Sequence, residues 1–168
     1  IESFFWTFTD DYVELVKDRA YGSRGAEAQA SVHAALATTL DTLLRLFAPF
    51  IPFATEEVWS WWRAGSVHRA SWPVTDGYAG LARDGDPEVL TVVGEALSGL
   101  RKSKSEAKVK QRTAVESATI SAPADVLARL RGGLDDLKAA GNAADVTLTE
   151  ADGELAVSDV VLEQTEQA

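Results

Sequence analysis

Residues 43–62 read LLRLFAPFIPFATEEVWSWW, and this stretch decides the helical character of the chain. The apolar spacing of three and four residues that ends here begins near residue 26, which predicts one helix over 26–48. Pro49 and Pro52 interrupt that helix, because proline lacks the N–H that a helix interior needs. A third helix is predicted to start near Thr55, whose hydroxyl suits an N-cap. The residues expected to be buried at the break are Phe50, Ile51 and Phe53.

The flanking segments on both sides extend this pattern. Residues 1–19 place apolar side chains at helical spacing, and Gly22 and Gly25 then predict a turn. After the third helix, residues 66–73 predict an extended loop that Pro73 closes. Residues 74–87 are rich in glycine and aspartate and are expected to be a linker.

The last third of the chain has a different pattern. A helix is predicted from Asp86, with a proline at its first position, and it runs into a basic segment. Residues 114–122 alternate and predict a strand, whereas residues 124–140 predict a helix. Residues 145–150 and 154–161 predict the two strands of a hairpin.

These elements predict a mainly α fold in two domains. Residues 1–112 are expected to form a helical bundle, and residues 113–168 a small α+β subdomain of strand, helix and hairpin. The chain has no methionine and opens with Ile1 inside an amphipathic pattern, so we expect it to be a fragment of a longer chain.

The composition excludes several classes of site. The 168 residues include no cysteine, which excludes disulfides and thiolate zinc sites. No run approaches the ~20 apolar residues of a membrane helix. The two histidines, His33 and His68, lack the context of a catalytic residue, and no phosphate-binding glycine motif occurs. We therefore expect no catalytic residue, no metal, no cofactor and no membrane partner in this chain.

The net charge of −10 is unevenly distributed. Residues 101–112, RKSKSEAKVKQR, hold six basic side chains and one acidic one, a local net charge of +5. The segments before and after carry −7 and −8. Two interpretations stay open: a solvated helix C-terminus, which cations favour, or a surface that neutralises nucleic-acid phosphates.

Aromatic side chains cluster near the N-terminus. Phe4, Phe5 and Phe8 share the apolar stripe, so core packing is their default role. Trp6 lies off that stripe, and an exposed ring near cations can stack on an unpaired RNA base.

Three landmarks resemble bacterial valyl-tRNA synthetases, which are class I aminoacyl-tRNA synthetases. They are FFWTFTDDYVELVKDRAYG (4–22), the segment 43–62 quoted above, and SVHRASWP (66–73), in family order. LRKSKSEAKVKQ (100–111) occupies the place of a basic helix-to-strand junction of that family. The family usually has a proline there, whereas this chain has Lys110, Gln111 and Arg112.

The resemblance implies an anticodon-binding fragment. The parent enzyme would join L-valine to tRNA(Val) with ATP in the cytoplasm, and its catalytic and editing domains would lie upstream in the same chain. These residues would then bind the tRNA(Val) anticodon stem-loop and catalyse nothing. For base contacts we predict Phe8 and Trp6, with Lys17 and Arg19 as hydrogen-bond donors. For phosphate contacts we predict Arg101, Lys102, Lys104 and Lys108.

Three alternatives remain at this point, and one is that the fragment binds no partner well alone, because the catalytic domain and a coiled coil supply other contacts. The chain could be a helical protein-interaction module without RNA specificity, which would use its aromatic surface and acidic faces. It could also be the same region of an isoleucyl-type synthetase, although many of those carry a cysteine zinc site.

Overall fold

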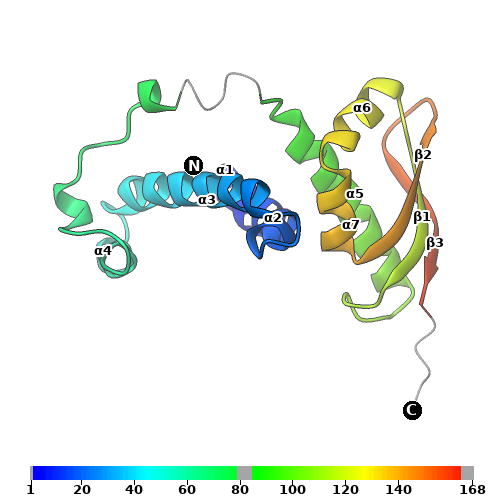
Figure 1. Ribbon diagram of the computed structural model, residues 1–168, viewed down its shortest axis with the longest axis horizontal. Coiled ribbons are helices and arrows are strands. Elements are labelled where there is room, and N and C mark those ends of the chain that lie inside the picture. Colours follow the sequence, from blue (N-terminus) through cyan, green and yellow to red (C-terminus); the bar gives the residue numbers. More distant parts are fainter. Residues whose placement is uncertain (1, 79–84, 164–168) are drawn as a thin grey trace, which may run out of the picture. The chain divides into compact units, whose positions relative to one another are not determined.

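The computed structural model describes residues 2–78 and 85–163 (Figure 1). Within them the chain forms two compact units, one of residues 2–23 with 86–163 and one of residues 24–78 with residue 85. Helices predominate and a single three-stranded sheet is described, which confirms the mainly α fold with a small α+β part. The predicted domain division at residue 112 stays a prediction.

The N-terminal helix of the first unit contains a π-helical segment. It consists of α1 (Glu2–Trp6), π-helical residues Thr7–Tyr12, and α2 (Val13–Ala20), which together confirm the predicted helix. Gly22 ends it with a φ of +86°, a value that glycine adopts without steric cost.

Helix α5 (Glu88–Glu106) forms the centre of the first unit. Asp86 helps to start it, because its Oδ1 accepts a hydrogen bond from the Glu88 N–H at 3.0 Å. Leu97 and Leu100 on its inner face are fully buried in a core shared with the sheet and with Leu15 of α2.

The sheet is built around its first strand. β1 (Val115–Ala122) lies between β2 (Ala143–Glu150) and β3 (Ala156–Leu162). β2 pairs with β1 in parallel and β3 pairs with it antiparallel, so the predicted hairpin of β2 with β3 is wrong. Ile120 of β1 is fully buried, and the apolar alternation of this strand suits a central position.

Two short helices make the crossover that the parallel pair of strands requires. The single helix predicted over 124–140 is divided into α6 (Ala124–Gly132) and α7 (Leu134–Gly141). Gly133 lies at the division, where a Cβ atom would come within 2.7 Å of Val93 Cγ2. The close approach of α5 therefore requires glycine at this position.

The second unit has a much smaller core. α3 (Ala26–Phe47) and α4 (Pro52–Ser60) confirm the predicted helices and the break between them. A short 3₁₀ turn (Val67–Arg69) follows, and a second one spans Thr75–Gly77. The buried apolar residues of this core are Leu44, Ala48, Trp59 and Val67.

The break between α3 and α4 differs from the prediction. Phe50, Ile51 and Phe53 are exposed, Phe53 to 91% of its surface, because Trp59 fills the small core instead. Thr55 is not an N-cap, since α4 already begins at Pro52. Thr55 is buried and donates its hydroxyl to the carbonyl oxygen of Ile51 at 3.1 Å.

Part of the predicted linker, residues 79–84, and residues 164–168 of the polar tail lie outside the described residues.

Candidate nucleic-acid interface

Aromatic rings form a row along the N-terminal helix. The Phe8 ring stacks between the rings of Phe4 and Tyr12, with centroids 6.0 and 5.5 Å apart and planes within 20° of parallel. Phe8 is half-buried in this row, whereas Phe4 at its end is 54% exposed. The stacking surface open to a nucleobase is therefore at Phe4, and Phe8 supports it from behind.

Trp6 is the second exposed ring of this helix. It is 54% exposed and meets the Phe5 ring edge to face, with centroids 5.3 Å apart. The π-helical segment begins at the next residue, Thr7, and π-helical turns within α-helices frequently occur at functional sites. The structure thus leaves Trp6 available to stack on a base, and its predicted base contact stays a prediction.

The two predicted donors on α2 already have carboxylate partners. Lys17 contacts Glu14, one turn earlier on the same helix. Arg19 donates from Nε to Asp136 Oδ1 at 3.0 Å, and its Nη2 lies 2.8 Å from Asp136 Oδ2. Because this two-point contact joins α2 to α7, Arg19 stabilises the packing of these two helices in the first unit.

Tyr12 lies beside this ion pair. Burial raises the pKa of its phenol above the ordinary value of 10.0; Arg19 partly opposes that rise and Asp136 adds to it. The phenol is therefore neutral at physiological pH and adds no negative charge to the aromatic row.

The basic segment 101–112 begins in the last turns of α5 and continues into a loop. Lys102 is exposed, and its Nζ lies 4.0 Å from Glu106 Oε1, a distance at which a surface pair contributes little. Arg101 is half-buried. The phosphate contacts predicted for these two side chains stay predictions.

Lys104 is buried, with 2% of its surface exposed. Its Nζ donates to the carbonyl oxygens of Gln111 at 2.9 Å and Gly141 at 2.7 Å. Burial and the nearby Arg101 charge lower its pKa. This position argues against the predicted phosphate contact, because the ammonium group is enclosed and its hydrogen bonds go to the protein.

Three loop cations are exposed: Lys108, which was predicted, and Lys110 and Arg112, which were not. The local charge of +5 already included the latter two. Their alternating spacing, at positions 108, 110 and 112, is the one signal in the sequence that could have grouped them. Only the tertiary structure shows which cations face solvent.

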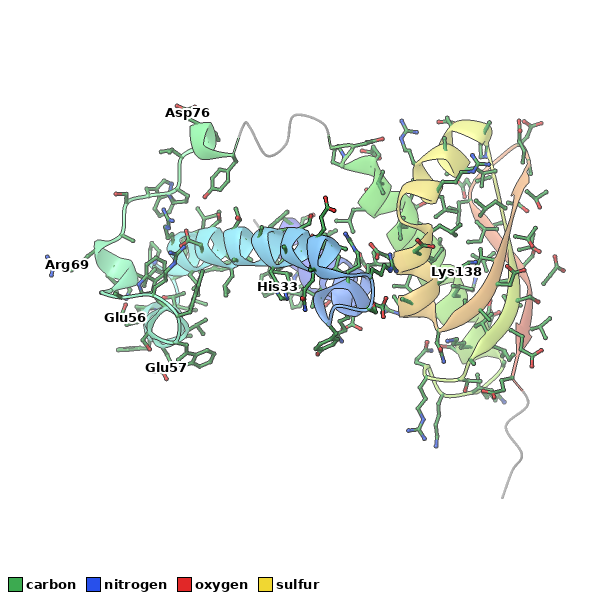
Figure 2. All side chains as sticks on the ribbon, in the orientation of Figure 1. His33, Glu56, Glu57, Arg69, Asp76 and Lys138 are labelled. Carbon is green, nitrogen blue, oxygen red and sulfur yellow. The ribbon has the colours of Figure 1, made fainter. Side chains whose placement is uncertain are left out.

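Among the other cations of the first unit, Arg131 on α6 is exposed and has no carboxylate within 4.0 Å among the described residues, whereas Arg129 and Lys138 are paired. Arg129 lies 3.1 Å from both Asp86 Oδ2 and Asp125 Oδ2. Lys138, labelled on α7 in Figure 2, has its Nζ 3.8 Å from Asp145 Oδ1. Apart from Arg131, the positive charge that the described part of this unit leaves available to an anionic partner is concentrated at the end of α5 and in the loop after it.

The second unit exposes a different set of rings. The Arg63 guanidinium lies over the Trp62 ring, 4.6 Å from its centroid, and donates to Asp41 at 3.0 Å. Asp41 also accepts from Arg45, so one buried carboxylate holds two arginines. The largely exposed aromatic rings of this unit are Phe50, Phe53, Trp61 and Trp72.

The described residues also bear on metal binding and on membrane insertion. No cluster of three or more His, Cys, Asp or Glu residues that could hold a metal occurs among them. In the same parts of the chain, no helix combines the length and the apolar character needed to cross a membrane.

Comparison with known proteins agrees with this geometry. The family model described as the anticodon-binding domain of tRNA ligase matches residues 1–120. The valine–tRNA ligase of Leifsonia xyli subsp. xyli is 48% identical over 163 residues, which cover 97% of this chain and 19% of that protein. That of Thermobifida fusca is 49% identical over 167 residues, covering 99% and 18%. That of Cutibacterium acnes is 53% identical over 138 residues, covering 81% and 16%. The chain therefore spans less than a fifth of the length of these relatives.

Proposed function

This chain belongs to the family of anticodon-binding domains of tRNA ligases, and from that premise we propose that it binds the anticodon stem-loop of valine tRNA. The similarity to valine–tRNA ligases over nearly the whole chain is the observation that supports valine tRNA as the partner. It favours the valine enzymes over the isoleucyl-type alternative. In this proposal the joining of valine, the use of ATP and the catalytic domain belong to the longer cytoplasmic enzyme, and these residues hold no cofactor.

The aromatic row of the N-terminal helix supports contact with unpaired bases. Anticodon bases are unpaired in an RNA loop and can be splayed out, so aromatic side chains can stack on them. Trp6 and Phe4 each present a ring that is 54% exposed. Stacking on such a ring is worth about 1–3 kcal/mol per base.

A binding assay with two RNAs tests this function. The full chain is titrated with a valine tRNA transcript and with the same transcript carrying a changed anticodon. We expect tighter binding of the unchanged transcript, and we expect Trp6→Ala to lower that affinity about tenfold while the circular dichroism spectrum stays the same. Phe8→Ala should also lower affinity, through the loss of support for Phe4.

Phe53→Ala is the matched control, because it removes an exposed ring of the second unit. Its affinity should equal that of the parent chain. If both transcripts bind equally weakly and Trp6→Ala changes nothing, the protein-interaction alternative replaces anticodon binding.

A further inference from the structure

The loop that joins α5 to β1 spans residues 107–114, and its first part, residues 107–112, follows a defined path (Figure 1). The Val109 N–H donates to the carbonyl oxygen of Lys104 at 3.1 Å, and the Thr113 N–H donates to that of Lys110 at 2.9 Å. Lys108, directly before Val109, has a φ of +56°, which is uncommon for a residue with a side chain. The loop is therefore held in a tight, locally costly conformation that its surroundings must stabilise.

Lys104 provides the strongest of these restraints. Its buried ammonium group donates to Gln111 in the loop and to Gly141 at the end of α7. Hydrogen bonds from a charged donor are stronger than those between neutral groups, and a buried charge without them is costly. Lys104 thus ties the loop to a helix that is distant in sequence.

Two side-chain amides add further restraints. Gln111 Nε2 donates to the carbonyl oxygen of Arg101 at 3.2 Å and to Ser105 Oγ at 3.0 Å. Asn142 Nδ2 donates to the carbonyl oxygen of Arg112 at 2.9 Å. The loop is consequently fastened at both ends, to α5 and to the turn before β2.

The side chains that this loop presents to solvent are cationic. Lys108, Lys110 and Arg112 are exposed, and within the described residues none of them has a carboxylate within 4.0 Å. Arg129 and Lys138 in the same unit are, by contrast, paired with aspartates. The loop that these hydrogen bonds hold in place is therefore the same loop that presents the unpaired cations.

We propose that residues 107–112 form a preshaped site for phosphate groups of an RNA backbone, with Lys108, Lys110 and Arg112 as contacts and Lys104 as a positioning residue. This rests on the proposed function, because the RNA is the tRNA named there. Phosphate contacts set the position of the RNA and carry no sequence information, so the loop complements the aromatic row. A loop ordered before binding loses less conformational entropy when the RNA docks.

The contacts are tested by the salt dependence of binding. The full chain and a triple variant, Lys108→Asn with Lys110→Gln and Arg112→Gln, are titrated with both transcripts over a series of salt concentrations. Asparagine is chosen at 108 because it tolerates a positive φ. The slope of log affinity against log salt should fall by about 2 in magnitude, since each lost phosphate contact removes about 0.7–0.9. Both transcripts should lose affinity by the same factor.

Paired cations supply the matched control. The triple variant Arg63→Gln with Arg129→Gln and Lys138→Gln removes as much charge from side chains that carboxylates already neutralise. It should leave the slope close to that of the parent chain. An equal fall in both triple variants would show a general charge effect and overturn the loop site.

The preshaping of the loop is tested first with two variants that do not change the charge. Gln111→Leu and Asn142→Gly each remove an amide restraint, and glycine suits the φ of +49° at residue 142. Each should lower affinity about two- to tenfold with an unchanged circular dichroism spectrum. Lys104→Met should lower affinity at least as much at a temperature where it stays folded. Parental affinity in both neutral variants would overturn the preshaping of the loop, and parental affinity in folded Lys104→Met would overturn the positioning role of Lys104.

Failure of this inference is separable from failure of the proposed function. Equal affinity of the parent chain for the two transcripts would refute anticodon binding, whatever the loop variants do. A preserved preference for the unchanged transcript, together with an unchanged salt slope in the loop triple variant, would refute the phosphate site alone.

Discussion

Two sets of cations, Lys17 and Arg19 on α2 and the basic segment 101–112, were both predicted to contact RNA, and they differ in the structure. On α2, Glu14 contacts Lys17 and Asp136 contacts Arg19. In the loop after α5, the described residues place no carboxylate within 4.0 Å of Lys108 or its two neighbouring cations. Whether a cation is available to RNA is thus decided by the carboxylates that folding brings to it.

The same lesson holds within a single helix. Lys102 and Lys104 are two residues apart on α5, yet Lys102 is exposed and Lys104 is enclosed. The helix turns about 200° between them, so one side chain faces solvent and the other faces α7.

Among the variants that test this difference between Lys102 and Lys104, Lys104→Met should have the largest effect on the free energy of unfolding. It leaves the carbonyl oxygens of Gln111 and Gly141 without their donor, which should lower the free energy of unfolding by about 3 kcal/mol. Lys102→Met, the control on the solvent side, should change it by less than about 0.5 kcal/mol. Urea unfolding followed by circular dichroism measures both, and equal values would mean that the ammonium group of Lys104 is not held as described.

A smaller effect is expected from Arg19→Met, which breaks the half-buried contact between α2 and α7. The free energy of unfolding should fall by about 1.5 kcal/mol, between the values typical of exposed and buried ion pairs. Lys17→Met, which breaks an exposed pair, should cost less than about 0.5 kcal/mol.

Arg19→Met also tests whether the carboxylate partner of Arg19 keeps this side chain from contacting RNA. Under conditions where the variant is folded, its affinity for the valine tRNA transcript should match that of the parent chain. A clear loss of affinity would instead support the base contact predicted for Arg19 from the sequence.

The smallest effect concerns pH. Because burial raises the pKa of Tyr12, the folded state favours the neutral phenol. The resulting contribution to stability is fully present below pH 10.0, the ordinary value, and is lost as pH rises through the higher folded-state pKa. The difference in phenolate absorbance between the parent chain and Tyr12→Phe measures this titration. Arg19→Met should move it to still higher pH, because Arg19 opposes the rise, and a shift to lower pH would contradict the assigned cause.

Local patterns predicted most of the helices correctly. The spacing of Leu44 and Phe47, followed by two prolines, predicted both α3 and its end, because helix period and proline chemistry act over a few residues. The hairpin failed because strand partners are chosen across the whole sheet. β1 is apolar enough to be central, and so it accepts β2 on one edge and β3 on the other.

The candidate site was predictable in kind and less so in detail. The sequence located the aromatic cluster and the basic segment, since both are compositional. It did not show that Phe8 is stacked between Phe4 and Tyr12, that Asp136 neutralises Arg19, or that Lys104 is enclosed. Each of these depends on a residue at least a helical turn away, and in two cases on another element.

By itself, the sequence determined the helical character, the excess of positive charge at residues 101–112 and the resemblance to a tRNA-binding family, because period, composition and landmarks are properties of the linear chain. Only the tertiary structure decided which cations remain free. That selection follows from packing: α5 and α7 meet so closely that a carbonyl oxygen of α7 lies 2.7 Å from Lys104 Nζ, while the loop beyond turns its remaining charges to solvent.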